Sequence, residues 1–128
     1  MMPRPLRVLL CAQPVDMRRS FDGLAELVVN KLDEDPTAEG ALFVFINTRR
    51  DRAKLLWRDS TGFCILYKRL EGRLFPVPEA PDGTHRLELN AGALAALLEG
   101  AEEQQPRAPT TREIARAARA IAQARMQR

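Results

Sequence analysis

Basic and aromatic side chains are interleaved between residues 47 and 78, and both kinds suit contact with nucleic acid. The candidate binding residues are Arg49, Arg50, Arg52, Lys54, Trp57, Arg58, Tyr67, Lys68, Arg69 and Arg73. Guanidinium groups bind phosphate oxygens, and aromatic rings stack on unpaired bases. A two-stranded ribbon is also narrow enough to enter a major groove about 12 Å wide. The alternative is a solvated or protein-contacting sheet face, whose arginines pair with the acidic side chains of the same block.

A second cluster of charged residues stands before an expected helix. Arg18 and Arg19 are candidates for an anion site, because the free backbone amides at a helix start also attract negative charge. The structural interpretation of the same residues has Asp16 capping the helix and Asp22 pairing with the arginines. We favour this second interpretation.

The sequence offers little for catalysis or for binding a metal. His85 is the only histidine and follows a turn-forming Pro-Asp-Gly-Thr, while Cys11 and Cys64 lie in apolar runs without Cys-x-x-Cys spacing. The acidic residues that a two-metal nuclease would need are embedded among arginines that can pair with them. Phosphate-loop and dinucleotide-binding patterns are absent. We therefore expect two buried thiols, no enzymatic activity, no metal and no cofactor.

Length and composition indicate one ordinary globular domain. The chain has 128 residues, of which 45% are hydrophobic and 29% charged. No apolar run approaches the ~20 residues that a membrane-spanning helix requires. The run from Val8 to Ala12 is also shorter than the ~7–15 residues of a signal-peptide core. We expect a cytoplasmic protein that does not contact a membrane.

The net charge of +3 conceals alternating blocks along the chain. Residues 47–78 contain eight basic and three acidic residues, a charge of +5, and the other blocks are 1–20 at +3, 21–46 at −5, 79–100 at −3 and 101–128 at +3. Complementary patches of charge steer and orient protein partners. The blocks therefore favour an alternative function, a protein-interaction adaptor that docks onto another protein or associates with itself.

The pattern of apolar residues predicts strands and one amphipathic helix in the first part of the chain. Strands are expected over 6–12, 41–46, 53–59 and 63–70, an edge strand or sheet exit over 73–78, and one more short strand over 85–89. Short turns join the four runs from 41 to 78, which indicates an antiparallel meander. Apolar residues recur at helical spacing between Phe21 and Leu32, and Pro36 follows that helix.

Two further helices are expected towards the C-terminus. Asn90 caps the first, which ends at Gly100, and a polar linker over 101–109 follows. Thr110 and Glu113 form a capping box that starts a basic helix over 110–128. The predicted fold class is α+β, an antiparallel β-meander packed with an amphipathic helix plus C-terminal helices, with a single domain over 1–100.

Three segments in this order resemble a known protein family. They run from Cys11 to Leu24, from Leu42 to Trp57 and from Gly62 to Pro76. The chain resembles the TnpB-type accessory proteins, the second open reading frame of bacterial insertion sequences of the IS sixty-six group, over about residues 6–100. The resemblance implies a non-catalytic role in transposition beside a larger transposase that carries the catalytic residues. We expect DNA at the element ends and that transposase as partners, with a homo-oligomer as an alternative.

Overall fold

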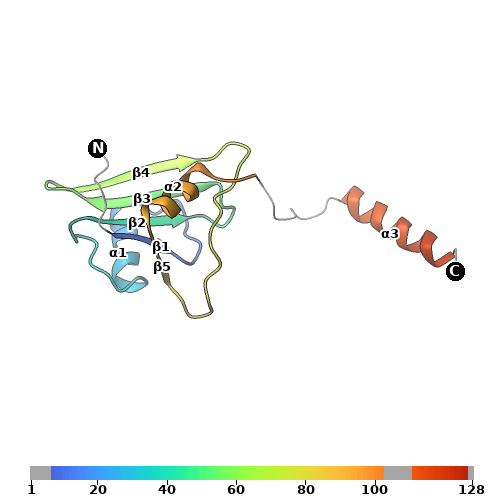
Figure 1. The fold of residues 1–128 in the computed structure, drawn as a ribbon, viewed down its shortest axis with the longest axis horizontal. Coiled ribbons are helices and arrows are strands. Elements are labelled where there is room, and N and C mark those ends of the chain that lie inside the picture. The colour runs from blue at the N-terminus through green and yellow to red at the C-terminus, as the bar shows by residue number, and fades with distance from the viewer. Residues whose placement is uncertain (1–6, 103–110, 127–128) are drawn as a thin grey trace.

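The computed structural model describes residues 7–102 and 111–126 (Figure 1). The elements, in chain order, are β1 (Arg7–Cys11), α1 (Phe21–Asn30), β2 (Ala41–Ile46), β3 (Arg52–Arg58), β4 (Phe63–Arg69), β5 (Arg86–Leu89), α2 (Ala91–Glu99) and α3 (Thr111–Met126). The predicted α+β class is confirmed.

The strands form one mixed sheet in the order β4-β3-β2-β1-β5. β2, β3 and β4 form the expected antiparallel meander, whereas β1 pairs in parallel with β2, and α1 makes the crossover between them. β5 returns antiparallel to β1 at the opposite edge from β4. The sequence pattern had not indicated the parallel pair.

The fourth run of the expected meander leaves the sheet instead of pairing with β4. Between 73 and 78 the described pairing is a single bridge from Leu74 to Ala101. Pro76 and Pro78 have no N–H group to donate to a ladder, which restricts strand pairing here. Of the two alternatives for this segment, the sheet exit is therefore correct.

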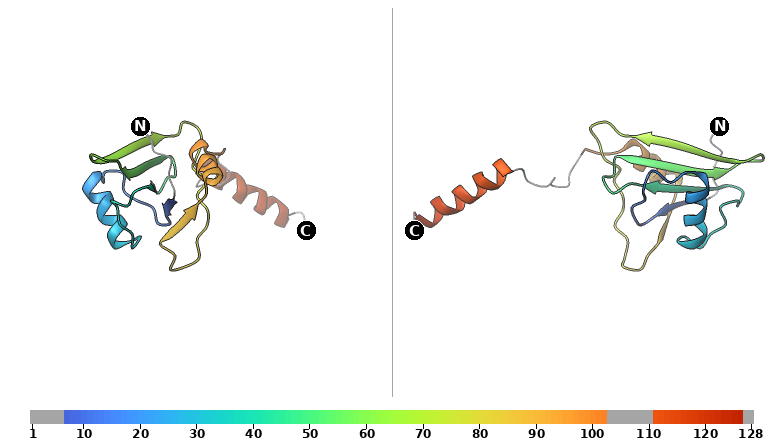
Figure 2. Two further views of the ribbon diagram at one scale, coloured as in Figure 1. Left: turned by 60° about the vertical axis from the view of Figure 1, so that its left-hand side comes forward. Right: turned by 180° about the vertical axis from the view of Figure 1, so that it is seen from behind.

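Each face of the sheet is covered by a different helix (Figure 2). On one side, Leu24 and Val28 of α1 form a buried cluster with Phe43 and Phe45 of β2. α2 contributes Leu94 and Leu97 to the other side. β2 is buried along its whole length, which explains why its residues are continuously apolar rather than alternating.

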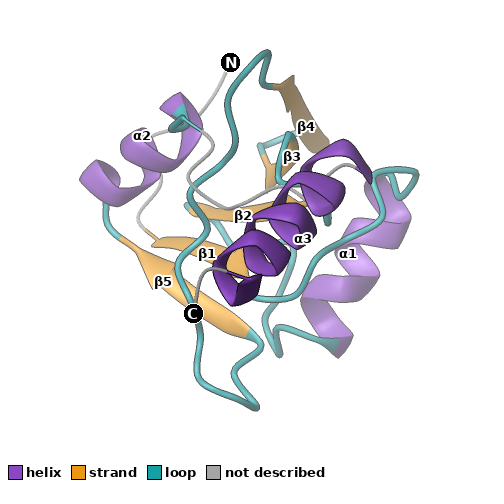
Figure 3. Ribbon diagram, turned by 90° about the vertical axis from the view of Figure 1, so that its right-hand side faces the viewer, coloured by secondary structure: helices purple, strands orange, loops and turns teal. Residues whose placement is uncertain are grey.

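The helix ends match the expectations only in part. Asn90 caps α2 by accepting a hydrogen bond from the backbone N–H of Ala93 at 2.7 Å, as predicted. The expectation that Asp16 caps α1 is wrong, because the N-cap is Ser20, four residues later. Figure 3 shows α1 and α2 on opposite sides of the strands.

Most residues of the C-terminal helix whose burial is described are exposed. Ile114 and Ile121 of α3 are 56% and 58% exposed. The capping residue Thr110 and most of the expected linker lie outside the described residues, so the domain boundaries remain a prediction. Within 7–102 and 111–126, no helix is long and apolar enough to cross a membrane.

Gly100 is expected to tolerate alanine much less well than Gly83 does. Both residues have a positive φ, near +79° and +83°, which an L side chain rarely adopts. A Cβ at Gly100 would lie 2.7 Å from Leu70 Cδ1, whereas a Cβ at Gly83 would meet nothing within 4 Å. We expect losses in unfolding free energy of about 3 kcal/mol for Gly100→Ala and about 1 kcal/mol for Gly83→Ala. Urea unfolding measures both, and equal losses would contradict the described packing.

Candidate nucleic-acid interface

Arginines from three separate segments gather at one edge of the sheet. The carboxyl ends of β1 and β2 lie at the same edge because the two strands are parallel. β3 begins and β4 ends at this edge, where Arg52 is the register partner of Arg69. We call this surface the arginine edge; it consists of Arg18, Arg49, Arg50, Arg52 and Arg69.

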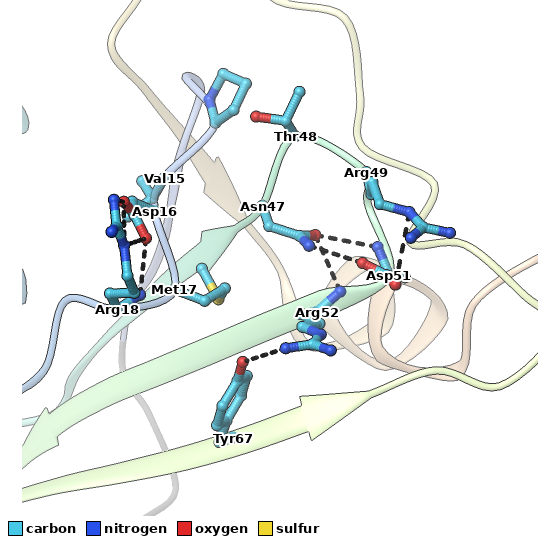
Figure 4. A pocket seen from close by; sticks show the side chains of 11 residues that line it. Val15, Asp16, Met17, Arg18, Asn47, Thr48, Arg49, Asp51, Arg52 and Tyr67 are labelled. Carbon is cyan, nitrogen blue, oxygen red and sulfur yellow. Dashed lines mark hydrogen bonds and ion pairs between the residues drawn. The ribbon is translucent and has the colours of Figure 1, made fainter. Parts of the chain in front are cut away.

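The arginine edge borders an open hollow of about 590 Å³ (Figure 4). One wall is the segment 14–18, the other is the segment 47–52, and Tyr67 of β4 closes the third side. Arg18, Arg49 and Arg52 all line this hollow. A smaller hollow of about 310 Å³ shares Arg52 and Tyr67 and adds Arg69 and Glu71. Arg50 lines a third one, of about 150 Å³.

The turn from Asn47 to Arg52 is held by its own polar groups. The Asn47 side-chain oxygen accepts hydrogen bonds from the backbone N–H groups of Asp51 and Arg52 at 3.1 and 3.0 Å. Its amide nitrogen donates to the Asp51 carboxylate at 2.7 Å. Arg50 has a φ of +63°, an uncommon left-handed conformation for a residue other than glycine. The turn therefore keeps its shape without using the arginine side chains.

Lys54 joins the segment before α1 to the sheet. Its ammonium group donates to the backbone oxygens of Met17 and Arg19, both at 2.7 Å, and lies 4.8 Å from the centre of the Tyr67 ring. The residue is only 8% exposed. Its place in the predicted binding set is therefore corrected: Lys54 positions the edge from beneath and is not part of the exposed surface.

Four of the ten predicted binding residues lie away from the arginine edge. Trp57 is 4% exposed, so its ring is part of the core and cannot stack on a base; this member of the set is also corrected. Lys68 and Arg73 donate to the backbone oxygens of Leu98 and Gly100, both at 2.8 Å. Arg58 lies at the other end of β3, with its guanidinium carbon 5.4 Å from the centre of the Phe63 ring.

Three of the arginines at this edge have an acidic neighbour. Arg18 pairs with Asp16 at 2.7 Å, Arg69 with Glu71 at 2.7 Å and Arg49 with Asp51 at 4.0 Å. The hydrogen bond from the Arg18 guanidinium lowers the pKa of Asp16 to about 2, so this carboxyl group is ionised at neutral pH. Such exposed ion pairs contribute little to the stability of the fold, so an anion that binds the guanidinium group more tightly can replace the carboxylate.

Arg52 differs from these three arginines. Within the described ranges it has no ion pair with a carboxylate, and it donates instead to the Tyr67 hydroxyl at 3.4 Å. The expected pairing of Asp22 with the arginines near α1 is wrong, since Asp22 makes no ion pair with an arginine in the described chain, and Arg18 pairs with Asp16 instead. Arg18 lines the hollow and Arg19 does not, so the two are not brought together as one anion site.

The two cysteines differ in burial, and neither belongs to a cluster of possible metal ligands among the described residues. Cys11 is a buried free thiol, whereas Cys64 is only half-buried, which corrects the expectation of two buried thiols. The Cys64 thiol donates to the Asp59 carboxylate at 3.4 Å. In the part of the chain that the structure describes, no group of three or more His, Cys, Asp and Glu residues could hold a metal ion.

Sequence reasoning treated Arg18 and the block 47–78 as two separate sites, and the structure brings them together. The signal that could have shown this is a helix placed between two buried strands. Such a helix is the usual crossover between parallel strands, whose carboxyl ends then share an edge. A polar segment after each strand, here 12–20 and 47–51, indicates where the two would meet.

Comparison with known proteins assigns the chain to a family. The family model described as IS66 Orf2 like protein matches residues 6–108. The chain is 40% identical over 80 residues to the uncharacterized protein y4jC of Sinorhizobium fredii, which covers 62% of this chain and 68% of that protein. It is 33% identical over 101 residues to the uncharacterized protein y4hO of the same organism, covering 79% and 85%. No solved structure matches the chain.

Proposed function

The chain belongs to the IS66 Orf2-like family of transposition accessory proteins, and from that premise we propose that it binds nucleic acid of its insertion sequence through the arginine edge. The observation that supports this proposal is the convergence of four arginines, Arg18, Arg49, Arg52 and Arg69, on hollows that share a half-exposed tyrosine, with Arg50 beside them on the same turn. Segments 11–24 and 42–57, which carry the family resemblance, both border the same hollow.

The charge at the edge favours a polyanion as the partner. Five arginines face three carboxylates, those of Asp16, Asp51 and Glu71, which leaves two positive charges in excess. The side chains of Arg18 and Arg49 are 92% and 86% exposed, so both can turn to a phosphate without rearrangement of the sheet. Guanidinium groups bind phosphate oxygens through charge-assisted hydrogen bonds.

A salt titration tests this proposal. Fluorescence anisotropy of labelled single-stranded and duplex element-end DNA, measured at several salt concentrations, yields the dependence of log K on log [salt]. Each phosphate contact contributes a slope of about −0.7 to −0.9, so three to five contacts predict a total slope of about −2 to −4.5. Affinity that does not change with salt would contradict binding through the arginine edge.

Removing the charge of Asp16 is expected to strengthen this binding. Asp16→Asn frees the Arg18 guanidinium for a phosphate, while the amide oxygen can still accept from the Arg18 backbone N–H, as the carboxylate does at 2.9 Å. We expect an affinity about 3-fold higher at low salt. Glu39→Gln, which makes the same change beside Arg58 at the opposite end of the sheet, is the matched control. An equal gain in the two variants would mean that only net charge matters.

One observation favours a protein partner as a second candidate. α1 exposes two large apolar side chains, Phe21 at 44% and Val29 at 52%, beside the acidic residues Asp22 and Glu26. We propose this face as a contact for the transposase of the same element. The test is co-purification of the two proteins after nuclease treatment, and the contact should be lost in Phe21→Ser. Light scattering at several salt concentrations shows whether a second copy binds instead.

A further inference from the structure

Tyr67 forms the wall between the two larger hollows of the arginine edge. Its ring is held on one side by the Lys54 ammonium group, 4.8 Å from the ring centre, and its hydroxyl accepts from Arg52 at 3.4 Å. Half of the residue's surface is nevertheless exposed, at 50%. The protein therefore fixes the orientation of an aromatic ring and leaves part of that ring open to solvent.

The size and lining of the larger hollow fit one nucleotide. Its volume of about 590 Å³ lies within the ~300–1,000 Å³ of typical small-molecule sites. Arg49 and Arg52 line the same hollow as the tyrosine, and Arg52 makes no ion pair with a carboxylate in the described part of the chain. One site thus contains both guanidinium groups that can bind a phosphate and an aromatic ring on which a base can stack (Figure 4).

We propose that this hollow receives a single unpaired nucleotide, with its base stacked on Tyr67 and its phosphate bound by Arg49 and Arg52. The inference rests on the proposed function and adds that the preferred partner is a single strand. A base within a duplex is stacked on both faces and cannot reach the ring, so a duplex contacts only the arginines at the rim.

The site has few free groups with which to distinguish one base from another. The Asn47 side chain, which also lines the hollow, uses its oxygen and its amide nitrogen within the turn. Stacking tolerates every base, because each has an aromatic face. We therefore expect similar affinities for strands of thymidine and of deoxyadenosine.

Three probes of equal length, about a dozen units, test the inference. They are an oligothymidine strand, an abasic strand with the same phosphates, and a duplex. The wild-type protein should bind oligothymidine about 10-fold more tightly than the abasic strand. Tyr67→Leu should remove this difference and leave the affinity for the duplex within about twofold of the wild-type value. Tyr67→Phe should retain most of the preference for oligothymidine over the abasic strand. Phe21→Leu, which changes another exposed aromatic side chain, should have no effect on any probe.

The outcomes separate this inference from the function on which it rests. If none of the probes binds, both proposals are overturned. If all three bind equally and Tyr67→Leu changes nothing, the nucleotide site is overturned while binding through the arginines stands. The wild-type comparison of oligothymidine with the abasic strand needs no variant, so a loss of folding in Tyr67→Leu does not affect it. An oligouridine strand in the same assay distinguishes RNA from DNA. Tighter binding of oligouridine than of oligothymidine identifies RNA as the preferred nucleic acid, and any other result identifies DNA.

Discussion

Replacing three arginines of the edge together is expected to weaken nucleic-acid binding about 100-fold at moderate salt. The variant is Arg49→Ala, Arg50→Gly and Arg52→Ala, with glycine at 50 because that residue has a φ of +63°. Each lost phosphate contact is worth about 1 kcal/mol. Three such losses add to about 3 kcal/mol, which raises the dissociation constant by roughly 100-fold. Anisotropy at several salt concentrations should also show the slope becoming shallower by about two.

A matched pair on β3 controls for net charge. Arg52 and Arg58 are exposed residues at the two ends of the same strand, and only Arg52 belongs to the arginine edge. Arg52→Ala should weaken binding about fivefold, and Arg58→Ala should weaken it less than twofold. Equal losses in the two variants would mean that binding follows total charge and has no preferred edge.

Lys54→Met is expected to reduce the free energy of unfolding by about 3 kcal/mol, because two hydrogen bonds from a charged donor are lost. The backbone oxygens of Met17 and Arg19 would lose their partner in a site that is largely shielded from water. The segment before α1 would then no longer be tied to β3, so Arg18 would move relative to Arg52. Nucleic-acid binding should fall together with stability, although Lys54 itself contacts no ligand.

Lys68→Met is the matched control for this effect. Lys68 makes one hydrogen bond, to the backbone oxygen of Leu98 at 2.8 Å, and lies away from the arginine edge. Its loss should cost about 1 kcal/mol and leave binding unchanged. Urea unfolding and hydrogen exchange of residues 15–20 measure both variants. Equal destabilisation, with unchanged exchange in that segment, would contradict the role assigned to Lys54.

Most of the secondary structure could be predicted from the sequence, because the apolar pattern that defines each element is local. The continuous apolar run Ala41–Ile46 indicated a strand, and that strand is buried on both faces. The pairing of β1 was not foreseen, since local pattern does not say whether two strands run parallel. Asp16 resembles a helix cap in type and position, but it is used instead to turn the chain at Arg18.

The sequence predicted which types of residue form the candidate site, but not which individual residues lie there. Lys54 and Trp57 belong to a strand whose interior is buried, and nothing nearby in the sequence shows that the partners of Lys54 come from Met17 and Arg19. The position of Arg18 depends on the same tertiary contact. Long-range packing determines which charged residues lie together at the surface, and the spacing of residues along the chain does not predict that packing.

Mapping of amide chemical shifts tests the central claim most directly. A strand of about a dozen unpaired nucleotides is titrated into the ¹⁵N-labelled full chain, and perturbed backbone amides are assigned along the sequence. We predict the largest changes at residues 15–18, 47–52 and 67–71, with little change at 37–40 and 58–60 at the other end of the sheet. Changes confined to that other end, to α1 or to α3, or no changes at all, would contradict binding at the arginine edge.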